Sequence, residues 1–196
     1  MNQLVLIRHS ISNPDANTPS RMWRLSHGGR QKCVQLAERL KPFSLGRIIS
    51  SIEPKAIETA YLTAQQLGIP THVADGLQEH ERDKVGFFES KELFNSKVLE
   101  MFAHPEEIVF GNESANHARE RFSEAINNLL EQFPEENLGI VTHGTVMSLF
   151  VCIKNDIDVQ DFWVRLEMPA YAVLSLPGYG LMDLVYGLGE NQRKSE

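Results

Sequence analysis

Two histidines of this chain each stand just after a short apolar run. His9 follows LVLI (residues 4–7) and Arg8, and His143 follows LGIV (138–141) with one threonine between. Short apolar runs of this kind are typical of strands buried on both faces. A strand end holds the next side chain in a fixed direction, which catalysis requires. Both imidazoles are therefore candidates for a catalytic role.

A third apolar run, RIIS (47–50), is followed by Ser51 and by a predicted helix that begins near Pro54 and Lys55. In an open α/β sheet the carboxyl ends of parallel strands meet at one edge, and helix N-termini point to the same place. Two histidines, an arginine, a lysine and several hydroxyl groups would then converge. Such a group indicates an anion pocket, and phosphate is the anion we expect.

These residue types also suggest a reaction. A neutral His9 imidazole can attack phosphorus and form a covalent phosphohistidine, which divides a difficult transfer into two easier steps. Arg8 offers a planar fork for phosphate oxygens, and a protonated His143 would add another donor. Expulsion of an alkoxide needs a proton, hence a carboxylic acid held protonated near neutral pH by partial burial. Glu79 and Glu81, in DGLQEHERD, are the candidates.

The elements that must position these residues follow from the spacing of apolar side chains. Helical spacing occurs around residues 33–40, 57–64 and 118–133. These predicted helices alternate with the three apolar runs and with a fourth run, AVLSL (172–176). Such alternation predicts an α/β fold, in which a mostly parallel sheet carries helices on both faces.

Three parts of the chain fit this alternation less simply. A Pro-Gly pair separates two apolar runs in LSLPGYGLMDLVY (174–186), which predicts a hairpin at the sheet edge near the C-terminus, followed by a mobile tail (187–196). Residues 80–116 carry mixed charge and a short helix near 94–102, and we interpret them as a lid-like insertion over the carboxyl edge of the sheet. Because no linker is evident, we expect one domain over residues 1–196.

Composition argues against several classes of protein. The formal net charge of −7 argues against a nucleic-acid binder, since recognition of the phosphate backbone needs clustered Lys and Arg. The apolar runs are too short for a signal peptide or a membrane span. Cys33 and Cys152 lack metal or redox spacing, and the remaining histidines lack ligand spacing. We expect a cytoplasmic protein with no metal or cofactor and no nucleic-acid or membrane partner.

Taken together, the motifs resemble those of the histidine phosphatase superfamily, which is also called phosphoglycerate-mutase-like. The family's opening R-H-G stands here as Arg8-His9-Ser10, and its late H-G as His143-Gly144. Four further stretches resemble family motifs in the family's order: LSHGGRQKCVQLAERL (25–40), SSIEPKAIETA (50–60), Leu77-Gln78-Glu79 and GNES (111–114).

The resemblance implies a phosphoglycerate-mutase-like fold and a role for each matching residue. His9 would be the nucleophile, Glu79 the proton donor, and Arg8 and His143 the phosphate ligands. Glu79 is favoured over Glu81 because it occupies the family's position. No cofactor is implied.

Two further positions, Ser12 and Lys55, belong to the expected phosphate site. Ser12 stands where the family usually has Thr or Ser, and we expect it to bind phosphate. Lys55 stands where the family usually has Arg, and a lysine supplies a point charge without the bidentate fork. Either phosphate binding is weaker, or another arginine, Arg21, Arg24 or Arg82, completes the clamp.

The expected function is hydrolysis of phosphate monoesters through a phosphohistidine on His9, by a phosphomonoesterase like the histidine acid phosphatases. A phosphoglycerate-mutase-type phosphotransferase is one alternative, but such mutases generally carry a longer chain and a larger lid. A non-catalytic regulatory module that binds phosphorylated ligands is another, motivated by Lys55. In each case the partner is a small phosphorylated substrate or inorganic phosphate.

Neither the substrate nor the oligomeric state can be read from the sequence. Specificity is expected to reside in the loop of residues 13–23 and in the 80–116 insertion, because loops on a rigid scaffold commonly carry recognition. Trp23 and Trp163 could line a substrate pocket. Large aromatic side chains serve packing more often, so neither is assigned a role.

Overall fold

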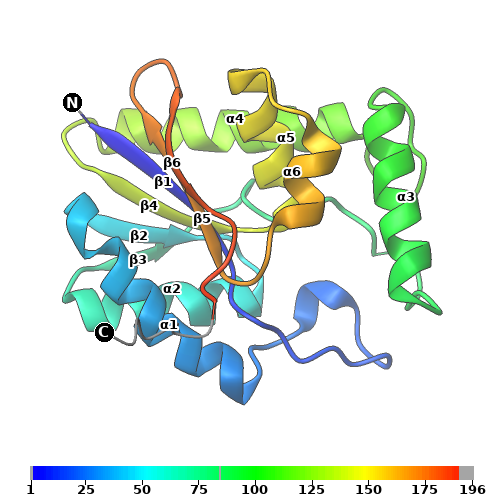
Figure 1. Ribbon diagram of the computed structural model, residues 1–196, viewed down its shortest axis with the longest axis horizontal. Helices are drawn as coiled ribbons and strands as arrows, with labels where there is room; N and C mark the ends of the chain where they lie inside the picture. The colour runs from blue at the N-terminus through cyan, green and yellow to red at the C-terminus, as the bar shows by residue number, and fades with distance from the viewer. Residues whose placement is uncertain (1, 84, 190–196) are drawn as a thin grey trace, which may run out of the picture.

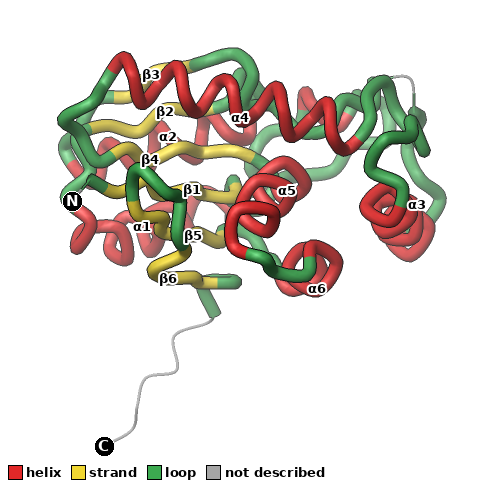
Figure 2. Tube along the Cα trace, turned by 90° about the horizontal axis from the view of Figure 1, so that it is seen from above, coloured by secondary structure: helices red, strands yellow, loops and turns green. Residues whose placement is uncertain are grey.

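The computed structural model describes residues 2–83 and 85–189. At its centre lies a six-stranded sheet in the order β3-β2-β4-β1-β5-β6 (Figures 1 and 2). The strands are β1 (Gln3–Arg8), β2 (Arg47–Ser50), β3 (Thr71–Val73), β4 (Leu138–Thr142), β5 (Ala170–Ser175) and β6 (Leu181–Val185). The first four strands are parallel to one another, whereas β5 pairs antiparallel with β1, and β6 antiparallel with β5. The predicted mostly parallel sheet and its C-terminal edge hairpin are confirmed.

Helices cover both faces of this sheet, as the alternation predicts. The α-helices are α1 (His27–Leu40), α2 (Pro54–Leu67), α3 (Lys91–Ala103), α4 (Ala115–Gln132), α5 (Gly144–Asn155) and α6 (Val159–Arg165), and two short 3₁₀ helices are η1 (Ser20–Met22) and η2 (Lys41–Phe43). Figures 1 and 2 together show α1 and α2 on one face and α4 and α5 on the other.

Strand β1 shows why its apolar run is continuous. Leu4 and Leu6 belong to the core that the sheet forms with α4 and α5, whereas Val5 and Ile7 belong to the core that it forms with α1 and α2. All four side chains are fully buried. Alternate side chains of a strand point to opposite faces, so a strand covered on both sides must be apolar at every position.

Local signals place helix N-termini at the carboxyl edge of the sheet. The Ser26 hydroxyl accepts a hydrogen bond from the Gly29 amide at the start of α1, which satisfies a donor that the first helical turn leaves free. Pro54 is the first residue of α2, where its missing N–H costs nothing. Helix α5 begins directly after β4, with His143 at the N-cap. The strand ends and helix starts therefore face one region.

Two elements escaped the sequence analysis, β3 and α6. The three residues of β3 are all exposed and the strand pairs only with β2, so it carries no apolar alternation. The seven residues of α6 cover about two turns, and its only buried side chains, Phe162 and Trp163, are adjacent. Both elements are too short for a period to emerge from their sequence.

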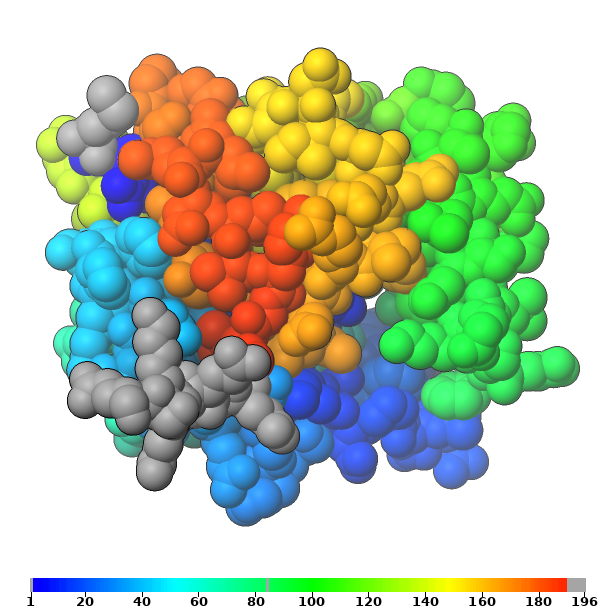
Figure 3. Space-filling model, viewed as in Figure 1, coloured from blue at the N-terminus to red at the C-terminus, as the bar shows by residue number. Residues whose placement is uncertain are grey.

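The segment of residues 80–116 includes α3, which stands beyond the carboxyl ends of the strands (Figures 1 and 2). Aromatic contacts anchor it: the ring centroids of Phe88 and Phe94 lie 5.3 Å apart, and those of Phe94 and Trp163 6.1 Å apart. On the face seen in Figure 3, this green segment lies next to the orange α6 region and above the blue N-terminal loops. Its action as a lid and the single-domain organisation remain predictions.

The C-terminal tail was predicted to be mobile from residue 187 onward. Residues 190–196 lie outside the described residues. In the described part, Leu188 is buried against α1 and α2, and its carbonyl accepts a hydrogen bond from the Lys32 ammonium at 3.2 Å. The start of the tail is therefore anchored rather than loose.

Candidate active site

The polar ends of β1, β2 and β4 meet at one place. The His9 amide donates to the Thr142 carbonyl and the Ser51 amide to the Val141 carbonyl, each at 2.9 Å, so the three strand ends are held side by side. The ring centroids of His9 and His143 lie 5.1 Å apart with an interplanar angle of 62°. Residues far apart in the chain thus place two imidazoles in edge contact.

These residues line a cavity of about 770 Å³. All six site residues named from the sequence contribute to its wall: Arg8, His9, Ser12, Lys55, Glu79 and His143. Glu81, the other candidate acid, is exposed and is not part of the wall.

The three arginines considered as substitutes for the family's second arginine differ in position. Arg82 lines the cavity. Arg21 instead pairs with Asp83 at 2.9 Å, and Arg24 lies 3.5 Å from Glu58, both with largely exposed side chains. Of the three, Arg82 is therefore the one placed to complete the phosphate clamp.

His9 is held as a neutral imidazole with a defined tautomer. Its Nδ1 lies 2.7 Å from the Ser10 carbonyl oxygen, and because a carbonyl only accepts, Nδ1 carries the proton. Burial, followed by the neighbouring His143 ring and the charge of Lys55, holds the pKa of His9 well below the usual range of histidine. Nε2 is consequently left with a lone pair, which is the requirement for a nucleophile.

The backbone that orients His9 is itself fixed by α1 and α2. The Ser10 amide donates to Oγ1 of Thr59 at 3.0 Å, and the Ser10 hydroxyl donates to the Gly29 carbonyl at 2.7 Å. Thr59 in turn donates to the Lys55 carbonyl at 2.7 Å. A serine where the family has glycine therefore adds a hydrogen bond to the scaffold.

Arg8 combines burial with unused hydrogen-bonding capacity. One terminal nitrogen donates to the Leu166 carbonyl, and Nε is buried without a partner among the described residues. A Cβ at position 144 would lie 3.1 Å from the guanidinium carbon, so Gly144 gives the side chain its room. Burial lowers the pKa of Arg8. A buried guanidinium of this kind is poised to gain from an anion.

His143 is anchored through Nε2, which lies 2.8 Å from the Ser51 hydroxyl and 3.4 Å from a carboxylate oxygen of Glu53. Burial and the Lys55 charge hold the pKa of His143 well below the usual range. The additional donor that a protonated His143 would supply is therefore not favoured by the electrostatics of this pocket. Nδ1 of His143 is buried with no partner among the described residues.

Lys55 does not face the cavity as a free cation. Its ammonium donates to the Ser20 carbonyl at 2.7 Å and forms a buried ion pair with Glu53. The other carboxylate oxygen of Glu53 accepts the Glu79 amide at 2.9 Å. Burial lowers the pKa of Lys55. The positive charge at this position is thus largely balanced inside the protein.

The carboxylate of Glu79 caps the N-terminus of α5. Its oxygens accept the amides of Thr145 at 3.1 Å and Val146 at 3.2 Å, as well as its neighbour's amide at 3.0 Å. Burial raises the pKa of Glu79, but the Arg82 charge, the His143 ring and these hydrogen bonds together leave it below its usual value. The expectation that burial keeps this acid protonated near neutral pH therefore does not describe this pocket.

Comparison with known proteins decides the family. The sequence model of the histidine phosphatase superfamily (branch 1) matches residues 4–180. The chain belongs to this superfamily. The resemblance seen in the sequence and the phosphoglycerate-mutase-like fold that it implied are confirmed.

Solved structures of the phosphoglycerate-mutase-like fold resemble this one over most of its length. Bacillus stearothermophilus YhfR has a TM-score of 0.74 and 20% identity, covering 94% of this chain and 96% of its own. Entamoeba histolytica phosphoserine phosphatase in complex with 3-phosphoglyceric acid has a TM-score of 0.72 and 18% identity, covering 94% and 97%. A mycobacterial glucosyl-3-phosphoglycerate phosphatase complexed with VO3 has a TM-score of 0.66 and 24% identity, covering 89% and 91%. At these identities the likeness shows the fold. No curated protein matches the chain in sequence.

Glu53 is a residue of this site that the sequence analysis did not single out. It lies within the stretch already matched to a family motif, one position before the proline that begins α2 and two before Lys55. Its side chain is buried beside both Lys55 and His143. The sequence did contain a signal for this role, because Glu53 is an acidic residue only two positions before Lys55, where the family usually has arginine.

A second group of residues holds the loop that carries Glu79. Arg121, on α4, donates to the carbonyls of Gly76, Gln78 and Glu79 at 2.9, 3.1 and 3.2 Å. It also pairs with Glu113 at 2.6 Å, and that carboxylate accepts a backbone amide of the same loop. Arg121 and Glu113, which we call the clamp, therefore position the loop of Glu79 from outside the cavity.

Within residues 2–83 and 85–189, no group of three or more His, Cys, Asp or Glu side chains is arranged to hold a metal ion. None of the helices described there combines the length and the apolar character that crossing a bilayer requires.

Proposed function

We propose that this protein hydrolyses phosphate monoesters through a phosphohistidine on His9. The observation that carries the proposal is the neutral His9 ring, whose Nδ1 is committed to the Ser10 carbonyl and whose Nε2 retains a lone pair. Around it stand Arg8 and Arg82, which offer positive charge to the oxygens of a phosphoryl group, and Lys55, whose charge is largely balanced by Glu53.

The reaction proceeds in two transfers. In the first, Nε2 of His9 bonds to phosphorus while the bond from phosphorus to the ester oxygen breaks, and the alcohol leaves with a proton. In the second, water attacks the phosphohistidine, the bond from nitrogen to phosphorus breaks, and inorganic phosphate leaves. Arg8, with an unpaired buried Nε, stabilises the charge on the equatorial oxygens in both steps.

Glu79 is proposed to carry the proton in both transfers. Its pKa is below the usual value in this pocket, but the negative charge of a bound phosphate disfavours a second anion beside it and raises that pKa. A substrate that binds as the phosphate monoanion also brings a proton, which Glu79 can take up. Glu79 then donates to the leaving alcohol and, as a carboxylate, accepts a proton from the attacking water.

The structural neighbours support a small phosphorylated substrate. Their descriptions name a phosphoserine phosphatase with 3-phosphoglyceric acid and a glucosyl-3-phosphoglycerate phosphatase with inorganic phosphate.

We place the activity in the cytoplasm, because Cys33 and Cys152 are free and buried, which fits a reducing compartment.

The test compares phosphate release by the wild type, His9→Ala and the control His104→Ala, which alters an exposed histidine outside the cavity. With an aryl phosphate and a panel of phosphorylated metabolites, wild type and control should release phosphate equally. His9→Ala should lose at least about a thousandfold in kcat. Turnover of ³²P-labelled substrate should leave an acid-labile, base-stable label on the wild-type chain.

Other outcomes would favour the alternatives. Phosphate that moves between two hydroxyl groups of a glycerate without release would indicate a mutase. Binding of inorganic phosphate without release from any substrate would indicate a regulatory module, for which the buried pairing of Lys55 with Glu53 is the motivating feature. A stable phosphoserine would assign the nucleophile to a hydroxyl group and contradict the proposal.

A further inference from the structure

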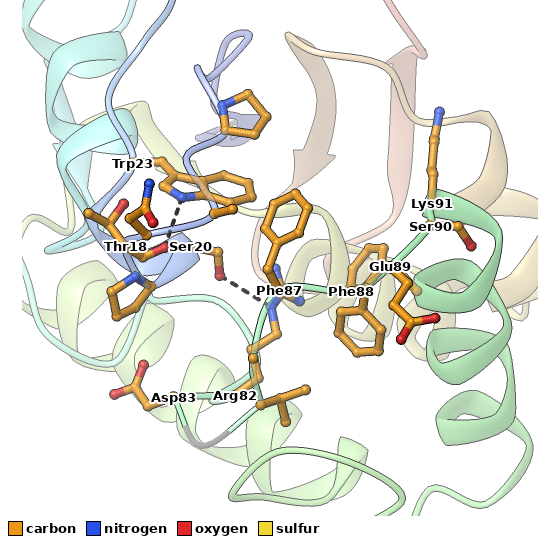
Figure 4. Close-up of a pocket in the computed structure, with 17 residues that line it drawn as sticks. Thr18, Ser20, Trp23, Arg82, Asp83, Phe87, Phe88, Glu89, Ser90 and Lys91 are labelled. Atoms are coloured by element: carbon orange, nitrogen blue, oxygen red, sulfur yellow. Dashed lines mark hydrogen bonds between the residues drawn. The ribbon is translucent and has the colours of Figure 1, made fainter.

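We infer that the part of the substrate beyond the phosphate is a flat, largely apolar group, which binds against an aromatic wall formed by Trp23 and Phe87. The inference rests on the proposed function, since it assigns the substrate class of that same site. It concerns a second cavity beside the candidate active site (Figure 4).

This second cavity has a volume of about 730 Å³ and adjoins the first. The two share six wall residues: Pro14, Ser20, Trp23, Arg82, Lys91 and Phe94. Its walls come from the loop of residues 14–23 and from residues 82–94. A molecule with its phosphate at His9 can therefore extend into this space, which we call the aromatic cavity.

Trp23 presents a fixed surface to this space. Its indole nitrogen donates to the carbonyls of Asp15 and Thr18 at 3.1 and 3.2 Å, so the polar edge of the ring is already satisfied. Figure 4 shows Trp23 beside Phe87, and their ring centroids lie 6.1 Å apart at 53°. The pair forms an apolar corner of the cavity, of which the Trp23 side is held in place by these hydrogen bonds.

Phe87 and Phe88 are neighbours in the chain with opposite environments. Phe88 packs on Phe94 and Phe110, with ring centroids 5.3 and 6.0 Å away, and so anchors the segment. Phe87 is 58% exposed and lines the aromatic cavity. A large aromatic side chain held open to solvent in a concave site gains from a ligand that covers it.

The charges around the cavity argue against a second anionic group on the substrate. Arg82 and Lys91 contribute positive charge, but the carboxylates of Asp83 and Glu89 line the same space. The described wall residues thus carry two positive and two negative side chains, of which Asp83 is paired with Arg21 from outside the wall. Arg82 is further engaged, since its guanidinium lies 4.9 Å from the Phe94 ring centre and its Nε 3.4 Å from the Ser20 hydroxyl.

The experiment compares two esters whose leaving alcohols are both primary and of similar basicity, 2-phenylethyl phosphate and ethyl phosphate. Wild type should prefer the phenylethyl ester in kcat/KM, mainly through a lower KM. Phe87→Ala should reduce kcat/KM for that ester about fivefold, which is the typical strength of an aromatic contact, and leave the ethyl ester unchanged. Trp23→Leu should act in the same direction.

Tyr61→Ala is the matched control. Tyr61 is also an aromatic side chain with 58% exposure, but it lies on α2 and lines neither cavity. It should leave both esters unchanged. Phosphoserine serves as the compact, charged competitor and should be the poorer substrate.

The outcomes separate the two proposals. If wild type releases phosphate from none of the three substrates or from the wider panel, the proposed function fails. If it hydrolyses them but does not prefer the phenylethyl ester, or if Phe87→Ala leaves that preference intact, the inference about the aromatic cavity is wrong while the phosphatase stands. A preference that Phe87→Ala removes and Tyr61→Ala preserves supports the inference.

Discussion

The candidate active site and the aromatic cavity beside it have similar volumes, about 770 and 730 Å³, but are built in opposite ways. In the first, buried side chains come from strand ends and helix starts, and hydrogen bonds hold them in place. In the second, two loop segments supply aromatic surfaces, one of them 58% exposed at Phe87. Chemistry at phosphorus needs atoms fixed to within fractions of an ångström, whereas recognition of an apolar group needs area.

The difference extends to electrostatics. In the candidate active site, burial and neighbouring charges lower the pKa of His9 and His143, so both rings are neutral near neutral pH. Burial also lowers the pKa of Lys55, although the charge of Glu53 acts in the opposite direction. The aromatic cavity works by contact area instead. Substitutions should therefore distinguish the two regions. Those in the candidate active site should change the rate, and those in the aromatic cavity should change substrate selectivity or local stability.

The largest expected effect follows from Arg8→Met. The substitution keeps the apolar stem but removes the buried guanidinium, so kcat/KM should fall about a hundredfold to a thousandfold for every substrate. Because it also removes a buried charge without a full set of partners, the free energy of unfolding should change by no more than about 1 kcal/mol.

Arg165→Met provides the control, since Arg165 is exposed and its partner Asp161 lies one turn away in α6. Steady-state kinetics and urea unfolding measure both quantities. A loss in kcat/KM of less than tenfold for Arg8→Met would remove this residue from the phosphate site.

The next effect concerns the clamp outside the cavity. Arg121→Met would leave three backbone carbonyls and the Glu113 carboxylate without their partner, so the free energy of unfolding should fall by about 2–3 kcal/mol. The kcat should fall as well, because the loop that carries Glu79 loses its support. Urea unfolding and kinetics check the two parts.

A double variant sharpens this prediction. Glu113→Gln in the Arg121→Met background should recover part of the lost stability, since no unpaired carboxylate then remains. If Arg121→Met shifts the free energy of unfolding by less than about 0.5 kcal/mol, this network does not hold the loop.

Stability should also depend on pH through His9 and His143, whose pKa values are held well below the usual range, and in the same direction through the buried His80, whose pKa burial also lowers. The folded protein keeps His9 and His143 neutral because their pKa values are lowered, whereas the unfolded chain takes up protons below about pH 6.5. The unfolded state then binds more protons, so stability is fully present above that pH and is lost as the pH falls. Each histidine contributes a slope of up to about 1.4 kcal/mol per pH unit.

Urea unfolding at several pH values between 7.5 and 5 measures this slope. His9→Gln and His143→Gln should each flatten it. A free energy of unfolding that stays constant or increases on acidification over this range would contradict the neutral state of both rings.

The smallest effect distinguishes neighbouring phenylalanines in the second region. Phe88→Ala should lower the free energy of unfolding by about 2 kcal/mol, because Phe88 packs on two other rings. Phe87→Ala should change it by less than about 0.5 kcal/mol, as for other exposed positions. Equal losses would mean that Phe87 is structural, and would weaken its assignment to substrate recognition.

The sequence by itself determined the parallel part of the sheet and the place of its chemistry. Continuous apolar runs require burial on both faces, and polar residues after three such runs must meet where parallel strands end. Arg8, His9 and His143 follow from that reasoning, and the structure brings them to one cavity. The same signal is too weak for β3 and α6, which are too short for a repeating pattern of buried and exposed residues to emerge.

Tertiary structure alone decided the charge state of the site and the surface beside it. Glu53, which pairs with Lys55, also lies against His143 from a distant part of the chain, and the pKa of Glu79 follows from the His143 ring and the Thr145 amide, more than 60 residues away, as well as from Arg82 and the His80 amide in its own loop. The pairing of Trp23 with Phe87 likewise joins two loops with no common pattern. Apolar periodicity is a local property of the chain, whereas electrostatic fields and cavity walls are sums over groups that only the fold brings together.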